Sequence, residues 1–390
     1  MSLVRAAYEK LSFPGGLMLR RVVMALAVLS VCFALANRVR ADEVKLVKIG
    51  VAAPLTGFSA SYGKDEANSQ GLVIGGQKVR FEVDSQDDAG DPKTAVLVAQ
   101  RFVDEGVSGV IGHHNSGCTI AASAVYHRAG IPQISPASSS PSYTAQGFET
   151  TFRTISNDDQ MAVLAANYTV KQLGAKRIAV IDDSTDYGTN LATEYVKAVQ
   201  KAGAELVSWQ YTTTKSIDFR AVLTTIKGQN PDLIFYVGQD IQAAGVAKQM
   251  HQLGIKAGYM GEGGFTNETF ARLVGPSGQG MYSWEYGAPL GRMPHAAELN
   301  AKMTERFGTG IVQFAPLAYD AAWAMVNAMK KADSTDPRGY LSSLHAVSFD
   351  GVTGTIAFNE RGDPRTASAT LYQQQAGKWV VLGVEQTSPR

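Results

Sequence analysis

Short runs of β-branched and aromatic residues alternate with longer stretches of helical periodicity along most of this chain. Lys78–Asp84 alternates apolar and polar side chains with period two, which is typical of a half-buried strand. Asp91-Pro92 then opens a helix, with an aspartate that can cap the first turn and a proline inside it. Ala95, Val98 and Phe102 continue this helix with apolar side chains on one face. Strands that alternate with helices in this way indicate parallel sheets covered on both faces.

The same patterns predict two consecutive series of elements, with the second beginning near residue 160. The predicted strands are Lys48–Pro54, Lys78–Asp84, Val107–Gly112, Ile131–Ile134, Arg177–Ile181, Glu205–Thr212, Pro231–Val237, Gly258–Gly261, Gly354–Phe358, Ser368–Gln373 and Lys378–Gly383. The predicted helices are the one that Asp91-Pro92 opens, Cys118–Ala129, Met161–Leu173, Tyr187–Ala202, Phe219–Ile226, Val246–Leu253 and Pro316–Lys331. Two similar series predict two α/β lobes, each around its own sheet.

Small and glycine-rich turns follow the predicted strands in both series. In open α/β sheets, ligands bind beyond the carboxyl ends of the strands, where such turns lie. Two sheets that face each other would direct the turns of both lobes into one cleft. The turns concerned are Gly112–Gly117, Ser135–Ser140, Asp182–Gly188, Gly238–Asp240 and Gly261–Gly264.

The first 41 residues have the order of a secretion signal. Two arginines precede the apolar run Val22–Ala36, and Val39-Arg40-Ala41 ends the polar stretch that follows. This order predicts a signal peptide over residues 1–41, cleaved after Ala41, and export to the periplasm. One alternative is a membrane anchor, although the run is short for a span of roughly 20 residues. Another is lipidation at Cys32, and Met18 is a second candidate start.

Net charge and cysteine content argue against a nucleic-acid partner and against a disulfide. The chain has 390 residues and a formal net charge of +1. Its first 41 residues hold six basic residues and one acidic residue, so the remainder keeps 30 basic against 34 acidic side chains, about −4. This balance leaves no basic patch for a nucleic acid. Cys118 is alone after cleavage, which excludes an intramolecular disulfide and favours a small buried thiol.

The sequence lacks the motifs of catalysis and of metal binding. The acidic stretch Asp87–Asp91 resembles the start of a calcium loop, but no glutamate completes it, and Asp91 fits better as a helix cap. His113-His114 are adjacent and would diverge in a strand or turn. Ser116 lacks the G-x-S-x-G context of a nucleophile, and no glycine-rich loop has the phosphate-binding spacing. We expect no enzyme, no cofactor and no metal.

Nine short sequence stretches follow one another in a distinctive order, although each is weak evidence when taken alone. They are Val51–Gly57, Ser61-Tyr62-Gly63, Asp87–Pro92, Val110–Ser116, Ile134–Pro141, Phe152-Arg153-Thr154, Tyr187-Gly188, Pro231–Gly238 and Ala318-Tyr319-Asp320-Ala321. In this order they resemble the periplasmic branched-chain amino acid binding proteins, the Leu/Ile/Val-binding branch of the type I solute-binding proteins. The resemblance extends over nearly all of the chain after residue 41.

This resemblance implies a periplasmic binding protein type I fold, with two Rossmann-like αβ lobes, a hinge and an interlobe cleft that closes on a ligand. It implies a first lobe of residues 42–157 and 288–364, and a second of residues 158–287 and 365–390. The expected function is to capture an amino acid, branched-chain by the resemblance, or a related small molecule. A monomeric protein would deliver it to the permease of an ABC transporter. The alternative is a ligand-sensing receptor module of the same fold, for an amide, urea or aromatic acid.

The resemblance assigns the ligand carboxylate to the first lobe. Ser116 matches a serine that binds it, and Ser139 matches a second hydroxyl in the following turn. Ala137 would offer its backbone, and Ser138 a further hydroxyl. Turns that precede helices supply such donors at the positive end of the helix. The competing interpretation is that these serines only cap turns and helices.

The opposite end of the ligand is assigned mainly to the second lobe. Tyr187 matches a tyrosine that reaches the ligand, and Glu262 matches the acid that pairs with its ammonium. Asp240 is the second candidate for this acid. Tyr62 and Phe314 are candidates for the apolar wall of the pocket.

Two features depart from the family pattern. Members often carry a disulfide at the positions that match Gly90 and Asn115, and here both cysteines are absent. The first crossover, Leu55–Gln77, also leaves only about Lys64–Ser69 for a helix, whereas a parallel crossover usually needs a dozen or more residues. We therefore expect lobe one to be loosely covered near this connection.

Overall fold

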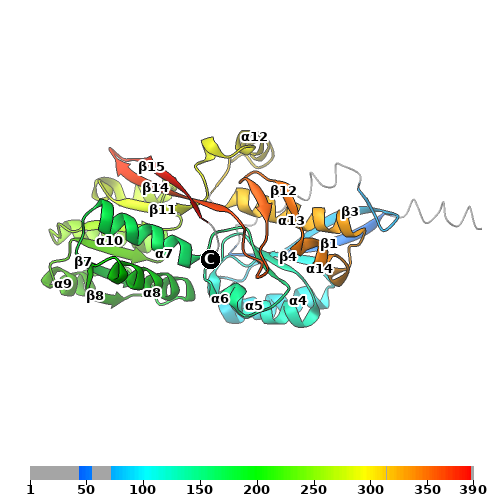
Figure 1. The fold of residues 1–390 in the computed structure, drawn as a ribbon, viewed down its shortest axis with the longest axis horizontal. Helices are drawn as coiled ribbons and strands as arrows, with labels where there is room; N and C mark the ends of the chain where they lie inside the picture. Colours follow the sequence, from blue (N-terminus) through cyan, green and yellow to red (C-terminus); the bar gives the residue numbers. More distant parts are fainter. Residues whose placement is uncertain (1–43, 55–71, 313, 388–390) are drawn as a thin grey trace, which may run out of the picture.

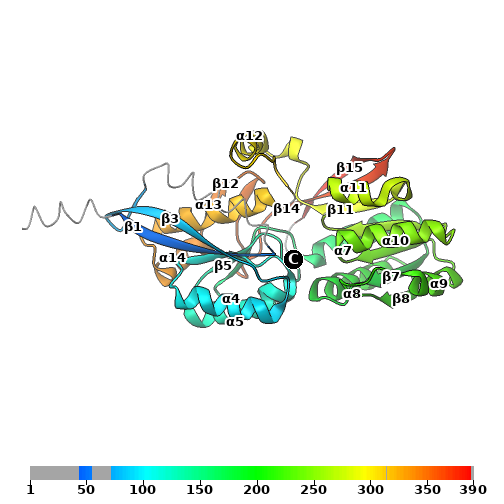
Figure 2. The same cartoon turned by 180° about the vertical axis from the view of Figure 1, so that it is seen from behind.

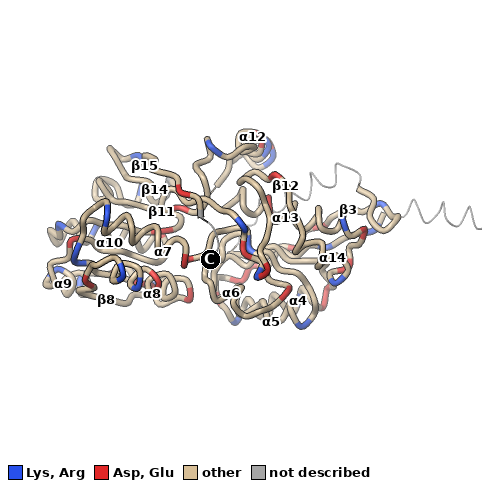
Figure 3. Tube along the Cα trace, viewed as in Figure 1, with Lys and Arg blue, Asp and Glu red and all other residues tan. Residues whose placement is uncertain are grey.

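The structure is a computed structural model that describes residues 44–54, 72–312 and 314–387. Two large sheets, each covered by helices, form two lobes that lie side by side (Figure 1). The view from behind shows the same two lobes, joined near the middle of the molecule (Figure 2). Acidic and basic residues are intermingled over both lobes (Figure 3). The two α/β lobes expected from the sequence are therefore present.

The first sheet has the order β2-β3-β1-β4-β5-β6, and its strands are parallel except for the pair β2-β3. The strands are β1 (Lys45–Ala52), β2 (Val73–Ile74), β3 (Gln77–Gln86), β4 (Gly109–Gly112), β5 (Gln133–Ser135) and β6 (Thr151–Arg153). On one face, α4 (Pro92–Asp104) and α5 (Ser116–Ala129) bury an apolar cluster. On the other face, α13 (Ala315–Ala332) and α14 (Pro337–His345) bury a larger one. The short helix α6 (Ser142–Ala145) follows β5.

The second sheet has the order β15-β14-β11-β10-β9-β7-β8, and its strands are parallel except that β14 runs antiparallel to both of its neighbours, β11 and β15. Its strands are β7 (Arg177–Asp182), β8 (Glu205–Tyr211), β9 (Leu233–Val237), β10 (Gly258–Glu262), β11 (Tyr282–Tyr286), β14 (Ala367–Gln375) and β15 (Lys378–Thr387). One face carries α7 (Asp158–Asn167), the π-helical turn η1 (Tyr168–Gln172) and α8 (Asp186–Lys201), and the other carries α9 (Arg220–Gly228), α10 (Asp240–Gln252) and α11 (Glu268–Val274). Both faces of the central parallel strands β7, β9 and β10 are therefore buried, as such a sheet requires.

Within the described residues, the chain passes between the two sheets at three places. It does so between β6 and α7, between β11 and α12 (Ala296–Phe307), and between β13 (Thr355–Ala357) and β14. The strand β12 (Ser348–Asp350) pairs with β13 beside the first lobe. The lobe limits inferred from the sequence fall in these connections, and they remain a proposal.

Most predicted elements agree with the structure in type and position, but three of the predictions need correction. The predicted helix Val246–Leu253 is part of α10, which begins six residues earlier, at Asp240. The first turns of α10 bury Ala243 and Ala244. Alanine is only weakly hydrophobic, so these positions add little to the apolar periodicity by which a helix is recognised in a sequence. The predicted helix Met161–Leu173 is α7 followed by a π-helical turn, and the last strand, β15, continues to Thr387.

The elements that were not predicted include β11, α11, α12 and α14. The start of α14 has the same signature as that of α4, because Asp336 caps it and accepts from the backbone N–H groups of Arg338 and Gly339, with a proline in the first turn. The pattern that identified α4 could therefore have identified α14.

Several of the sequence-based expectations lie outside the described residues. The first crossover beyond Pro54, with its candidate helix Lys64–Ser69, is one, and the pocket residue Tyr62 is another. The predicted signal peptide and its cleavage point also lie there.

Amide hydrogens of β3 should exchange with solvent faster than those of β7. β7 pairs with β8 and β9 and is buried along its last five residues. Among the described residues, β3 has only the two-residue strand β2 on its outer side, and it exposes alternate side chains. Less covered segments open at a lower free energy. Hydrogen exchange read by mass spectrometry checks this, and equal, strong protection in both strands would contradict it.

Candidate functional site

A cavity of about 730 Å³ lies between the lobes and is formed by the turns predicted to face each other. All five predicted turns contribute to it, at residues 114–117, 137 and 139, 184–187, 238–240 and 263–264. Tyr286 and Phe314 also line this cavity. We call this the interlobe cavity.

Ser116 lies at the first-lobe wall of the interlobe cavity, as the first residue of α5. The N-cap residue of α5, Asn115, makes no side-chain capping bond, so the helix end keeps backbone N–H groups for another acceptor. Ser116 is buried, and its Oγ accepts weak bonds from the Ser140 N–H (3.3 Å) and the Ser138 hydroxyl (3.4 Å). Its own hydroxyl proton therefore remains available for a ligand.

The turn that follows β5 brings the other candidate donors. Ala137 and Ser139 line the interlobe cavity, with Ser139 almost fully buried. Ser138 is not among the lining residues, because its fully buried hydroxyl points to Ser116 and its carbonyl binds Arg153. In this structure Ser138 supports Ser116 and does not itself reach the cavity.

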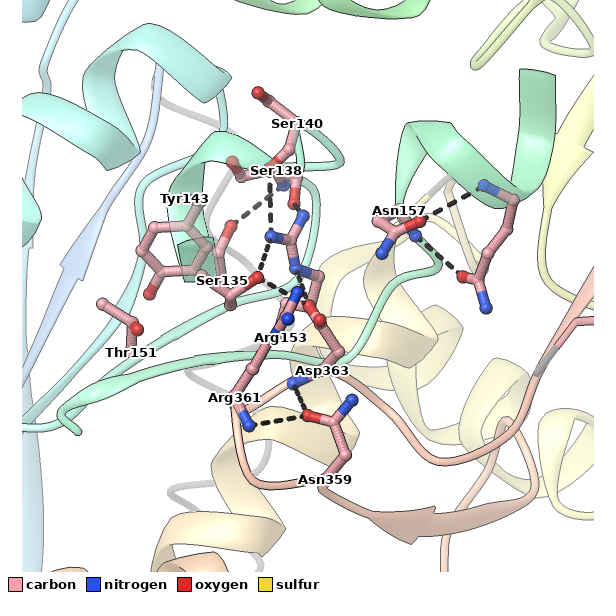
Figure 4. A network of polar contacts seen from close by, with 12 residues as sticks. Ser135, Ser138, Ser140, Tyr143, Thr151, Arg153, Asn157, Asn359, Arg361 and Asp363 are labelled. Carbon is pink, nitrogen blue, oxygen red and sulfur yellow. Dashed lines mark hydrogen bonds and ion pairs between the residues drawn. The ribbon is translucent and has the colours of Figure 1, made fainter. Parts of the chain in front are cut away.

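Arg153, at the end of β6, holds this turn in place (Figure 4). Its fully buried guanidinium donates to the carbonyl oxygens of Ser138 (2.8 Å) and Ser140 (2.9 Å) and to the Thr144 hydroxyl (2.8 Å). It also forms an ion pair of 2.7 Å with the Asp363 carboxylate, from the connection between β13 and β14. Charge-assisted bonds of this kind are the strong ones in a protein interior, so one side chain fixes the turn and a connection between lobes.

Tyr187 and Glu262 meet on the second-lobe side. Tyr187 lines the interlobe cavity, and its hydroxyl donates to the backbone carbonyl of Glu262 (2.9 Å). The Glu262 side chain is fully buried beneath the lining residues Gly263 and Tyr286, and its Oε1 accepts from the Tyr286 hydroxyl (2.8 Å). Its Oε2 has no hydrogen-bond partner, and burial raises the pKa of this carboxyl well above its usual range.

The remaining candidates occupy other parts of the wall. Asp240 lines the cavity, but its Oδ1 accepts from the Ile241 N–H (2.8 Å) and its Oδ2 from the Asn267 amide (2.9 Å). Phe314 lines the cavity at the start of α13 and packs edge-on against His114, with ring centroids 5.2 Å apart. Both residues therefore line the cavity, but both carboxylate oxygens of Asp240 already accept hydrogen bonds from the protein.

Three side chains at this site were not predicted from the sequence: His114, Asp158 and Tyr286. His114 lines the cavity, and burial lowers its pKa, which favours a neutral ring. Tyr286 ends β11, a strand that the sequence analysis missed. Asp158 begins α7 and is fully buried, with its Oδ1 3.0 Å from the Tyr286 hydroxyl oxygen. An acid four residues after the Phe152-Arg153-Thr154 stretch was a signal that could have drawn attention to it.

The acidic and histidine residues near the start of α4 and α5 have structural partners. Asp91 caps α4 and accepts from the Thr94 N–H (2.8 Å), so the predicted cap is confirmed. The fully buried His113 pairs instead with Asp88 (2.6 Å), away from His114. Among the described residues, no three His, Cys, Asp or Glu side chains group as metal ligands.

Cys118 is buried, and burial raises the pKa of its thiol to about 12. The helices in the described ranges include none with the length and apolarity to cross a membrane.

The two lobes touch beside the interlobe cavity. The Asn190 amide of α8 donates to the Ser140 hydroxyl (2.9 Å). A Cβ on Gly117 would lie 2.5 Å from the Asp186 carboxylate, so a larger residue here would require this carboxylate to move. Since Ser140 also donates its N–H to Ser116, the contact between lobes is linked to the candidate ligand site.

Comparisons with known proteins agree with this architecture. Residues 46–378 match the model of the periplasmic binding protein family. The chain is 32% identical over 342 residues to Leu/Ile/Val-binding protein homolog 1 of Brucella suis, covering 85% of this chain and 91% of that protein. It is 30% identical to the leucine-, isoleucine-, valine-, threonine-, and alanine-binding protein of Pseudomonas aeruginosa, covering 84% of this chain and 89% of that one.

A solved structure resembles the whole fold. The branched-chain amino acid transporter substrate binding protein LivJ of Streptococcus pneumoniae, in complex with isoleucine, superposes with a TM-score of 0.77 at 26% identity, covering 88% of this chain and all of that one. The two α/β lobes, the three connections between them in the described part of the chain, and the cavity that they enclose agree with the type I architecture. This chain belongs to the periplasmic binding protein family.

Proposed function

We infer that this protein captures an amino acid outside the cytoplasm and delivers it to an ABC transporter. The observation that carries the inference is the opposite polarity of the two walls of the interlobe cavity. The first lobe presents hydroxyl and N–H donors at the start of α5, whereas the second lobe holds a buried carboxyl with an unpaired oxygen. An α-amino acid has a carboxylate for the first wall and an ammonium for the second.

The carboxylate of the ligand would bind at Ser116, the backbone near Ala137 and the Ser139 hydroxyl. Ser116 has a free proton to donate, and the N-terminus of α5 favours negative charge. Ser138 acts indirectly in this proposal, by positioning Ser116.

The ammonium would pair with Glu262, next to Tyr187 and Tyr286. A charge that enters a closing, water-poor cavity needs a partner, because an unpaired buried charge costs several kcal/mol. The unpaired Glu262 Oε2 meets this requirement better than Asp240, whose two oxygens are already engaged.

The names of the relatives support a branched-chain amino acid as the ligand. Export through a signal peptide cleaved after Ala41, a monomeric state and docking to an inner-membrane permease belong to the same proposal. A binding protein that closes on its ligand and releases it unchanged needs no catalytic group.

A thermal-shift screen of amino acids and related acids tests the function. A ligand at about a hundred times its dissociation constant should stabilise the protein by about 2.7 kcal/mol. The expected result is a rise in melting temperature with leucine, isoleucine or valine. A shift only with acids or amides that lack an amino group would contradict the amino acid assignment.

Ser116→Ala and Ser139→Ala should each weaken amino acid binding by about tenfold or more. Each removes a donor to an ionised carboxylate, and such bonds are worth roughly 1.5–3 kcal/mol. Isothermal calorimetry with L-leucine measures the change. Ser342→Ala, an exposed position on α14, is the matched control and should keep the affinity. Unchanged affinity in both cavity variants would remove these serines from the site.

A further inference from the structure

Two buried carboxyls share one hydroxyl behind the second-lobe wall. The Tyr286 hydroxyl lies 3.0 Å from Asp158 Oδ1 and 2.8 Å from Glu262 Oε1. A tyrosine hydroxyl has a single proton, so it can donate to only one of the two oxygens. The other short contact needs a proton on the carboxyl, which would then donate to the tyrosine oxygen.

The second oxygen of each carboxyl strengthens this conclusion. Asp158 and Glu262 both have side chains with no exposed surface, and neither Asp158 Oδ2 nor Glu262 Oε2 has a partner with hydrogen-bond geometry. The Ser139 hydroxyl also lies beside the Asp158 carboxyl and favours its ionised form, but less than burial disfavours it. Two ionised carboxylates at this spacing would both be buried and poorly solvated, which is costly.

The surrounding charges do not compensate the pair. Arg153 is the cation that favours the ionised form of Asp158, but its guanidinium is engaged by Asp363, two carbonyls and the Thr144 hydroxyl. The other titratable neighbours are acids and phenols. They are Asp159 beside Asp158, Glu285 beside Glu262, Asp183 beside Tyr187, and Tyr187 and Tyr286 themselves. Burial raises the pKa of Asp158 to about 7, and the pKa of Glu262 well above its usual range.

We propose that Asp158 and Glu262 form a paired-carboxyl site for the ligand ammonium, which holds a proton in the empty protein and releases it when the cation enters. The proton passes from the carboxyl to the solvent, and the ammonium takes over its role of neutralising the pair. The inference rests on the proposed function and extends it, because it names Asp158 as a second acid of the site and gives the ligand class as cationic at this end.

Two consequences follow from the release of a proton. Affinity for an amino acid should rise with pH until the pair is fully ionised, by at most about tenfold per pH unit for one proton. An analogue with a hydroxyl in place of the amino group should bind more weakly and release no proton, because it brings no positive charge.

Calorimetry of L-leucine binding in two buffers with different ionisation enthalpies measures the proton directly. At pH 6 to 7, the wild type should release a substantial fraction of one proton per ligand. Asp158→Asn should abolish most of this release, while Asp159→Asn, an exposed acid one residue away, should retain it. Binding with the same heat in both buffers would overturn the proposal.

The empty protein provides a second readout. A carboxyl with a raised pKa binds its proton more tightly in the folded state, so its stabilising effect is complete near pH 4 and is lost as pH rises through about 7. The melting temperature of the wild type should therefore fall relative to that of Asp158→Asn between pH 5 and 8. Parallel pH profiles would overturn the paired-carboxyl site itself. If the profiles diverge but no amino acid shifts the melting temperature, the carboxyl pair stands and the amino acid function fails.

Discussion

Replacing Arg153 by methionine should lower the free energy of unfolding by about 3–5 kcal/mol, the usual cost of breaking a buried ion pair by removing one partner. The guanidinium has no exposed surface, and the substitution would leave the nearly buried Asp363 carboxylate without its cation. The carbonyl oxygens of Ser138 and Ser140 would also lose their donor. Urea denaturation at neutral pH measures the change.

The same substitution should also weaken ligand binding, because the turn that carries Ala137 and Ser139 loses its support. Arg101→Met is a suitable control, because Arg101 forms an exposed ion pair with Glu105 on α4 and should change stability little. A loss of less than about 1 kcal/mol in Arg153→Met would mean that the turn holds its shape without the arginine.

Glu262→Gln should weaken the binding of an amino acid by about 30-fold to several thousandfold. Removing one partner of a buried charge pair costs about 2–5 kcal/mol, because the ligand ammonium would be left with a neutral amide. The hydroxy-acid analogue of leucine, which has no ammonium, should bind the variant nearly as well as the wild type. Calorimetric titration of both ligands gives the ratio of wild-type to variant affinity for each. A loss confined to the amino acid indicates charge pairing, whereas an equal loss for both ligands indicates a general disturbance of the cavity.

Asp240→Asn is the matched control for this experiment. Asp240 also lines the interlobe cavity, but its carboxylate oxygens are bound by Ile241 and Asn267, so its loss should affect affinity much less. The reverse order of effects would make Asp240 the ammonium partner. Full affinity in both variants would indicate a natural ligand that lacks the amino group.

Local patterns in the sequence were sufficient for the alternation of strands and helices. A strand such as β7 is buried on both faces, so its run of β-branched residues is informative without knowledge of its neighbours. The cap and proline of α4 act within one turn of the chain, and the structure confirms them. The positions of the cavity turns followed from the same patterns, because a turn after a parallel strand must lie at the carboxyl edge of the sheet.

The site residues Ser116, Ala137, Ser139, Tyr187, Asp240 and Phe314 were named from the sequence, through the resemblance to a family, and all of them line the cavity. Their contacts with a ligand remain a proposal. Ser138 was named with them but does not line the cavity. The direction in which the side chain of a turn residue points depends on the hydrogen bonds of the whole turn, here those that Arg153 makes.

Only the tertiary structure decided which charges are buried together. Asp158, Glu262 and Tyr286 belong to α7, β10 and β11, and they meet because the sheet places β10 beside β11 and α7 packs over it. Arg153 and Asp363 are likewise distant in sequence and are joined where the chain crosses between the lobes. The sequence determined the helices and strands, because propensity and periodicity act within one segment. The shared proton and the buried ion pair depend on burial and on charges from other segments, which no local pattern contains.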